Sequence, residues 1–202
     1  MKLCSGSNLQ MVRAARLLFA AMFALMSEQL FATVLITDSD FDVGDVSSEF
    51  QYVTGPHYAI EALNPPKAST MLGRLGDFKP APVSLGLGFK DTPLWLTCEM
   101  ENQTDQDVSV YLELPRQYFW SIRMFKNVEG VVVDESHVGI EVDARDHSFM
   151  AAQTTFKVTM NSGQRVRLLF NAVAQGYVDL TAKAYSRKSY FVQAYRTNNL
   201  NG

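Results

Sequence analysis

Cysteine is scarce in this chain, and its scarcity excludes a disulfide framework. Of the 202 residues only Cys4 and Cys98 are cysteines, and Cys4 falls in an N-terminal leader. A mature domain with one cysteine has no internal disulfide, so it depends on its hydrophobic core for stability. Alternation along the surrounding segment places Cys98 on the face opposite Trp95, among strand-like neighbours. We therefore expect a buried, inert thiol rather than a nucleophile.

A basic excess and the common catalytic motifs are also absent. The chain has 18 basic and 21 acidic residues, a formal charge of −3, which argues against a nucleic-acid partner. It has no Gly-x-Ser-x-Gly, Ser-x-x-Lys, His-Glu-x-x-His or phosphate-loop motif. His57, His137 and His147 are far apart, and none stands at metal-ligand spacing to another histidine or cysteine. We predict no metal, no cofactor and no enzyme, with a secreted glycan-active enzyme as the weakest alternative.

The sequence has no apolar run long enough to cross a bilayer comfortably. Its N-terminal apolar stretch, Leu17–Met26, follows Arg13 and Arg16 and leads through small and polar residues to Ala32. A basic region, a short apolar region and a small residue in this order predict a secretory signal peptide over residues 1–32. We expect export, with an uncleaved N-terminal anchor as the alternative.

An acidic stretch, Asp38–Glu49, raises the question of calcium. Acidic residues stand at the first, third, fifth and twelfth places of an EF-hand loop. The sixth place is Val43 instead of the glycine that the sharp turn needs, and no helices are expected on either side. We predict a solvated edge segment rather than a calcium site.

Alternation with period two is what the sequence has in quantity. In Val108–Leu114, four apolar residues share one face of a strand, while Ser109, Tyr111 and Glu113 share the other. Similar segments recur at the spacing of an all-β domain, separated by polar and glycine-containing turns. The expected strands are ATVLITD, SEFQYVTG, PLWLTCEMEN, DVSVYLELP, SIRMFKNVEG, VVVDESHVG, TTFKVTMNSGQ, RVRLLFNAVAQG and YVDLTAKAYS. We predict an all-β fold, an antiparallel β-sandwich or jelly roll.

Two residues between Pro93 and Pro115 have both a structural and a functional interpretation. Trp95 stands near the start of an expected strand; we predict packing in the core or at a sheet edge, with a ligand platform as the alternative. Asn102 begins an Asn-Gln-Thr sequence that formally accepts a glycan. We predict that this asparagine shapes the turn instead.

The order of these motifs resembles one family of periplasmic sensors, the 7TMR-DISM extracellular domains of the second type. The shared pattern covers about residues 78–191 and includes Trp95, Asn102, Pro115, Gly130, Gly139 and Gly176. The chain departs from the pattern at Thr97 and Cys98, because the family usually has an arginine soon after the tryptophan.

The resemblance implies a jelly-roll sensor domain over residues 78–191. We expect an extended segment over 33–77, with a helical turn around Ala68–Leu72, and a linker over 192–202. In the family the domain precedes seven transmembrane helices and an intracellular histidine kinase or diguanylate cyclase, so we expect such a region beyond Gly202. The implied location is the periplasmic side of the inner membrane. The implied fold is similar to carbohydrate-binding modules, which is not by itself evidence of sugar binding.

Aromatic and basic residues are the best candidates for a ligand site. The rings are suited to stacking on a sugar face near a bend, and the arginines supply planar donors for hydroxyls or a carboxylate. The alternative is that the rings cap the core. The predicted ligand-binding residues are Tyr118, Trp120, Arg116, Arg123, Arg145 and His147.

These features together predict an extracytoplasmic sensor domain of a bacterial signalling receptor. Its partner would be a small ligand, with carbohydrate as the candidate class, and binding would shift a conformational equilibrium carried through the membrane helices. A free periplasmic carbohydrate-binding or adhesion module is the alternative. A homodimer stays open.

Overall fold

The computed structural model describes residues 32–55, 65–81, 86–89, 93–114, 119–138, 154–174, 177–179 and 181–200, which belong to one compact unit. The predicted signal peptide lies outside these residues, apart from Ala32. In chain order the elements are β1 (Thr33–Ile36), β2 (Val43–Asp45), η1 (Ser47–Glu49), β3 (Gln51–Thr54), α2 (Pro65–Leu72), η3 (Leu75–Asp77), β4 (Lys79–Pro80), β5 (Gly86–Phe89), β6 (Leu94–Asn102), β7 (Val108–Leu114), β8 (Phe119–Val128), β9 (Val131–Val138), β10 (Thr154–Met160), β11 (Arg165–Ala174), β12 (Tyr177–Asp179), β13 (Lys183–Ser186) and α3 (Arg187–Leu200).

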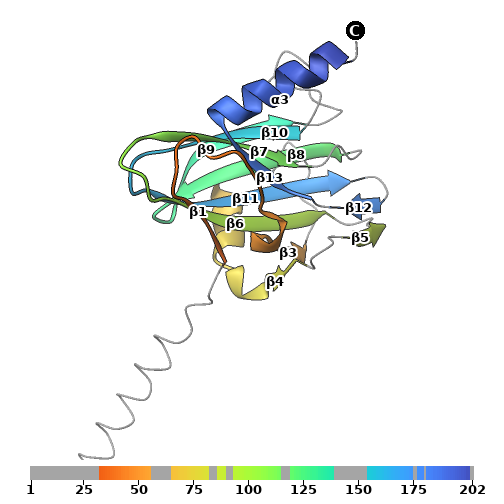
Figure 1. The fold of residues 1–202 in the computed structure, drawn as a ribbon. Helices are drawn as coiled ribbons and strands as arrows, with labels where there is room; N and C mark the ends of the chain where they lie inside the picture. The colour runs from red at the N-terminus through yellow and green to blue at the C-terminus, as the bar shows by residue number, and fades with distance from the viewer. Residues whose placement is uncertain are drawn as a thin grey trace, which may run out of the picture. The chain divides into compact units, whose positions relative to one another are not determined.

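Two sheets pack face to face and form the body of the domain (Figure 1). The seven-stranded sheet has the order β4-β3-β6-β11-β8-β9, and β1 joins it by pairing with β6. The four-stranded sheet has the order β10-β7-β13-β2, and β5 pairs with β12 apart from both. The predicted all-β, antiparallel sandwich is confirmed, except that β1 runs parallel to β6.

The main core lies between the inner faces of the two sheets. Period-two alternation turns Leu94, Leu96, Cys98 and Met100 of β6 inward, as it does the apolar residues of β7 and β11. Near the middle, the ring of Phe170 on β11 lies 5.4 Å from that of Phe156 on β10. Residues of both sheets therefore share one apolar cluster, which holds the sandwich together.

The predicted turns form as their residues require. Glu129 and Gly130, between β8 and β9, both have positive φ angles of 51° and 86°, the arrangement of a two-residue hairpin turn. Asn102 is fully buried at the end of β6. Its Nδ2 donates to the carbonyls of Gln106 and Asn161, at 2.7 and 2.9 Å, and its Oδ1 accepts from Thr104. The prediction that Asn102 shapes the turn is confirmed, and a side chain so engaged is not exposed for glycosylation.

Three local expectations need correction. The segment YVDLTAKAYS is two strands, because β12 pairs with β5 while β13 pairs with β7 and β2 in the four-stranded sheet. The expected helical turn is an eight-residue helix, α2. No helix was expected after Ser186, yet α3 begins there, and the Ser186 hydroxyl accepts a hydrogen bond from the Ser189 amide. This N-terminal cap is the local signal that predicts such a helix.

The acidic stretch Asp38–Glu49 forms a turn, the edge strand β2 and the short helix η1. Asp45 accepts hydrogen bonds from the hydroxyl and the amide of Ser47, at 2.6 and 2.9 Å, and these bonds lower the pKa of its carboxyl. Among the described residues no group of three His, Cys, Asp or Glu side chains could hold a metal ion. The predicted edge segment is confirmed.

Candidate functional site

A row of outward-facing residues crosses the seven-stranded sheet from β6 to β9. Asn171 on β11 lies opposite Trp95 on β6 and, on its other side, opposite Arg123 on β8. Arg123 in turn lies opposite His137 on β9. Antiparallel pairing therefore brings to one level of the sheet four side chains that are far apart in the sequence.

The Trp95 end of this row is closed. Trp95 has no exposed surface and packs with Met71 of α2, with Phe78, and with Phe125 and Leu169 from the neighbouring strands. Helix α2 thus covers a second, smaller core on the outer face of the sheet. The prediction that Trp95 packs in a core is confirmed, and its ring is not available as a ligand platform.

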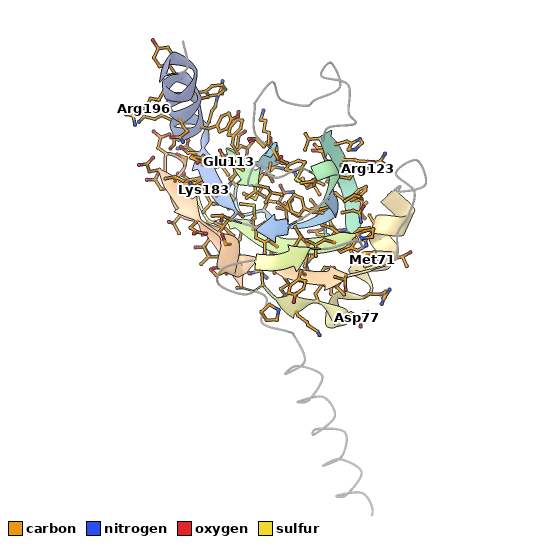
Figure 2. All side chains as sticks on the ribbon, turned by 90° about the vertical axis from the view of Figure 1, so that its right-hand side faces the viewer. Met71, Asp77, Glu113, Arg123, Lys183 and Arg196 are labelled. Carbon is orange, nitrogen blue, oxygen red and sulfur yellow. The ribbon has the colours of Figure 1, made fainter. Side chains whose placement is uncertain are left out.

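The Arg123 end of the row is polar and partly open. The Arg123 guanidinium lies 3.2 Å from a carboxylate oxygen of Glu135, and their side chains are 16% and 33% exposed. Two residues before Arg123 on β8, the hydroxyl of Ser121 lies 2.7 Å from the Nε2 atom of His137. We call Ser121, Arg123, Glu135, His137 and Asn171 the Arg123 row. Figure 2 shows Arg123 on the side of the domain that also carries Met71 of α2.

Asn171 has a hydrogen-bonding group without a partner among the described residues. The residue is 5% exposed, and its amide nitrogen Nδ2 is buried without a hydrogen-bond partner. Native proteins pair nearly all such groups, and an unpaired one costs about 1–3 kcal/mol. A polar group that reached this nitrogen, by displacing the atoms that cover it, would remove this cost.

The chemistry of the row suits hydroxyl groups. A hydroxyl both donates and accepts, so it is matched where donors stand beside an acceptor. Arg123 and Asn171 provide N–H donors, and the Glu135 carboxylate provides acceptor oxygens. The pairing of Arg123 with Glu135 also leaves no net charge on the pair, which favours a neutral ligand.

Of the six predicted ligand-binding residues, the structure describes the side chain of Arg123 only. Arg116, Tyr118, Arg145 and His147 lie outside the described residues. The backbone of Trp120 is part of β8, but the side chain of this residue is not described. No pattern in the sequence points to Ser121, Glu135 or Asn171 as ligand-binding residues, and His137 stands out there only as a possible metal ligand.

The outer face of the four-stranded sheet carries a different cluster, beneath α3. Tyr111 on β7, Tyr185 on β13 and Tyr190 on α3 are all buried. The rings of Tyr111 and Tyr190 stack at 4.6 Å with 7° between their planes. Next to them, burial raises the pKa of Glu113, against the opposing effects of Lys183 and a hydrogen bond from Tyr185. Glu113 and Lys183 lie on this side in Figure 2.

Cys98 takes no part in either surface. It lies in the main core, and burial raises the pKa of its thiol far above the usual range. A thiol held protonated is a poor nucleophile. The prediction of a buried thiol is confirmed, and the raised pKa is consistent with the predicted lack of reactivity.

Comparison with known families identifies the domain. The sequence model of the family described as 7TMR-DISM extracellular 2 matches residues 44–186. The chain belongs to this family. It is therefore a sensor-type extracellular domain of membrane receptors, and its location is extracytoplasmic. Among the described residues of this 7TMR-DISM extracellular domain, no helix has the length and apolar character needed to cross a membrane.

Other comparisons give only distant likenesses. No curated protein matches this 7TMR-DISM extracellular domain. An exo-β-1,3-galactanase from Phanerochaete chrysosporium is 10% identical with a TM-score of 0.30, over 71% of this chain and 28% of the galactanase. A carbohydrate-binding module specific for non-crystalline cellulose is 11% identical with a TM-score of 0.28, over 52% of this chain and 72% of the module. The module TmCBM61, solved with β-1,4-galactotriose, is 9% identical with a TM-score of 0.26, over 71% of this chain and 81% of the module. At these TM-scores the likenesses carry no inference about ligand or activity.

Proposed function

We propose that this domain senses a small neutral polyhydroxylated ligand, a carbohydrate or a related polyol, at the Arg123 row. The observation that carries the proposal is the unused, buried Nδ2 donor of Asn171 beside the Arg123–Glu135 pair. A ligand hydroxyl bound there accepts from Asn171 and donates to Glu135. Binding then gains hydrogen bonds to groups that are already held in place by the sheet.

The six residues predicted from the sequence belong to the same proposal. Arg123 is shared between the two sets. Tyr118 and Trp120 are proposed to stack on the ligand, and Arg116, Arg145 and His147 to contact its rim. The domain itself performs no chemistry in this proposal.

We also propose a signalling output for the receptor, on the basis of its family. A receptor of this type would carry the domain on the periplasmic side of the inner membrane, after a cleaved signal peptide, and would end in a histidine kinase or diguanylate cyclase. Ligand binding then favours one of two conformations, and a difference of a few kcal/mol between them is enough to change the output.

Calorimetric titration of the full chain with a panel of neutral oligosaccharides and polyols tests the site. Asn171→Leu and Arg123→Met should each weaken binding of the best ligand by about 10- to 100-fold, the value of one or two lost hydrogen bonds to the ligand. Arg165→Met is the matched control, because Arg165 lies on the same outer face and pairs with Glu101 away from the row.

Asn171→Leu separates binding from folding. It replaces a buried amide, whose nitrogen has no partner among the described residues, by an apolar group of similar size, so the free energy of unfolding should stay equal or increase while binding is lost. Binding that survives both substitutions at the row would refute the site. Sequencing the gene past the codon for Gly202 tests the output: transmembrane helices with a kinase or cyclase support the receptor, and a stop codon leaves a free binding module.

A further inference from the structure

The carboxyl group of Glu113 is partly buried on the outer face of the four-stranded sheet, on the side of the domain that carries α3 (Figure 2). On β7 this residue lies opposite Thr155 of β10 and, on its other side, opposite Lys183 of β13. Its atom Oε2 is buried and has no hydrogen-bond partner among the described residues. Burying an ionised carboxylate in this way is costly, whereas the neutral acid costs far less.

Helix α3 covers this region through Tyr190. The Tyr190 ring stacks on that of Tyr111, which stands two residues before Glu113 on β7. It also meets the Tyr185 ring edge to face, with 6.1 Å between the ring centres. Both Tyr185 and Tyr190 interact electrostatically with Glu113, and the Tyr185 hydroxyl donates a hydrogen bond to it. Undocking of α3 therefore takes Tyr190 away from Glu113 and lets water reach the carboxyl group.

The charged groups around Glu113 do not compensate for its burial. Burial raises the pKa of its carboxyl above the ordinary value of 4.5, and this effect exceeds the lowering effect of Lys183. Lys157 on β10 is exposed and lies opposite Tyr111 instead of Glu113. The basic residues of α3 are also exposed, and they are Arg187, Lys188 and Arg196.

We propose that Glu113 and α3 form a pH-sensitive switch, in which the neutral carboxyl group holds α3 docked and its ionisation favours release of the helix. The released state exposes the carboxyl group to water, so it gives up its proton more readily than the docked state. Proton binding and α3 docking are therefore linked, and each favours the other. The domain then responds to acidification in addition to the ligand proposed above. The switch is independent of that ligand, because the Arg123 row lies on the other sheet.

The direction of the response follows from the two states of the helix. With α3 docked the pKa of Glu113 is raised, so its contribution to docking is full below 4.5 and is lost as the pH rises through the docked-state pKa. Burial also raises the pKa of Tyr185 and of Tyr190, so both phenols stay neutral over this range. Acid therefore favours the docked helix, and neutral pH favours its release.

Hydrogen exchange of the full 202-residue chain over a pH series, from about 4 to about 8, tests the switch. The rate of each amide is compared with its intrinsic rate at the same pH, which gives a protection factor. In the wild type the protection factors of α3 should fall severalfold as the pH rises. Glu113→Gln is the matched variant, because its side chain is of similar size, stays neutral and leaves every histidine in place. Its α3 protection factors should not show this fall.

Three further variants sharpen the test. Lys183→Met removes the charge that favours ionised Glu113, so the fall in α3 protection should extend to higher pH than in the wild type. Tyr190→Ala removes the ring that docks α3, so α3 protection should be low at every pH. Glu101→Gln is the control: Glu101 lies on β6 in the other sheet, so its substitution should leave the wild-type curve of α3 unchanged.

Equal pH dependence of α3 protection in the wild type and in Glu113→Gln would overturn the proposal. A Lys183→Met curve that coincides with the wild-type curve, or falls at lower pH, would overturn it as well. If Glu113→Gln does not fold, the comparison of Lys183→Met with the wild type still decides the question. Failure of ligand binding at the Arg123 row would refute the proposed function and leave these curves unaffected.

Discussion

The outer faces of the two sheets are covered by helices of different chemistry. Helix α2 covers the seven-stranded sheet through apolar contacts, and Ala68 and Met71 are buried in one cluster with Trp95. Helix α3 covers the four-stranded sheet through tyrosines, with Glu113 and Lys183 nearby. The contacts of α2 extend the core of the domain. The contacts of α3 leave polar groups at their edge. The comparison predicts that α2 is part of the global fold while α3 can detach alone.

Truncation of Trp95 should have the largest effect. Trp95→Ala removes the largest fully buried side chain among the described residues and leaves a cavity between α2 and the sheet, so we expect a loss of about 3–5 kcal/mol in the free energy of unfolding. Urea denaturation measures it. A loss below about 1 kcal/mol would show that the α2 side is not a core.

Truncation of Tyr190 should have a smaller and more local effect. Tyr190→Ala removes the ring stacked on Tyr111, and we expect a loss of about 2–3 kcal/mol in the docking of α3. Because α3 follows the last strand, the chain can release it without unfolding the sandwich. Hydrogen exchange should therefore become faster in α3 and stay unchanged in β6 and β11. Uniformly faster exchange would contradict the comparison.

The smallest expected effect is the pH dependence of Glu113. Its folded-state pKa is raised by burial, so its contribution to stability is full below its ordinary pKa of 4.5 and is lost as the pH rises through the folded-state pKa. Since glutamine stays neutral, wild type should lose stability relative to Glu113→Gln as the pH rises from 4 towards neutrality. Thermal denaturation over a pH series measures this difference.

Glu101 serves as the control, because its pKa is shifted in the direction opposite to that of Glu113. Hydrogen bonds from Arg165 and Gln103 lower its pKa, so its contribution is present above the ordinary value of 4.5 and is lost as the pH falls. Wild type should therefore gain stability relative to Glu101→Gln as the pH rises. Parallel pH curves for the two variants would contradict the assignment of a desolvated Glu113 on the α3 side.

Most of the fold could be predicted from the sequence, and most of the site could not. The Arg123 row shows the reason. From the turn at Glu129 and Gly130, an uninterrupted hairpin would place Ser136 opposite Arg123. A bulge between Lys126 and Asn127 shifts the register, so His137 lies there instead. A shift by one residue changes which side chains share a face, and the sequence gives no sign of it.

The sequence by itself determined the strands, the turns and the inward face of each strand, because alternation, glycine and asparagine act over a few residues. It also determined the family. Only the tertiary structure decided what covers the outward faces. Trp95 is buried because α2 packs on it, and Asn171 meets Arg123 because β11 pairs with β8. Such contacts join residues distant in the chain, and their free energy depends on a register that no local pattern specifies.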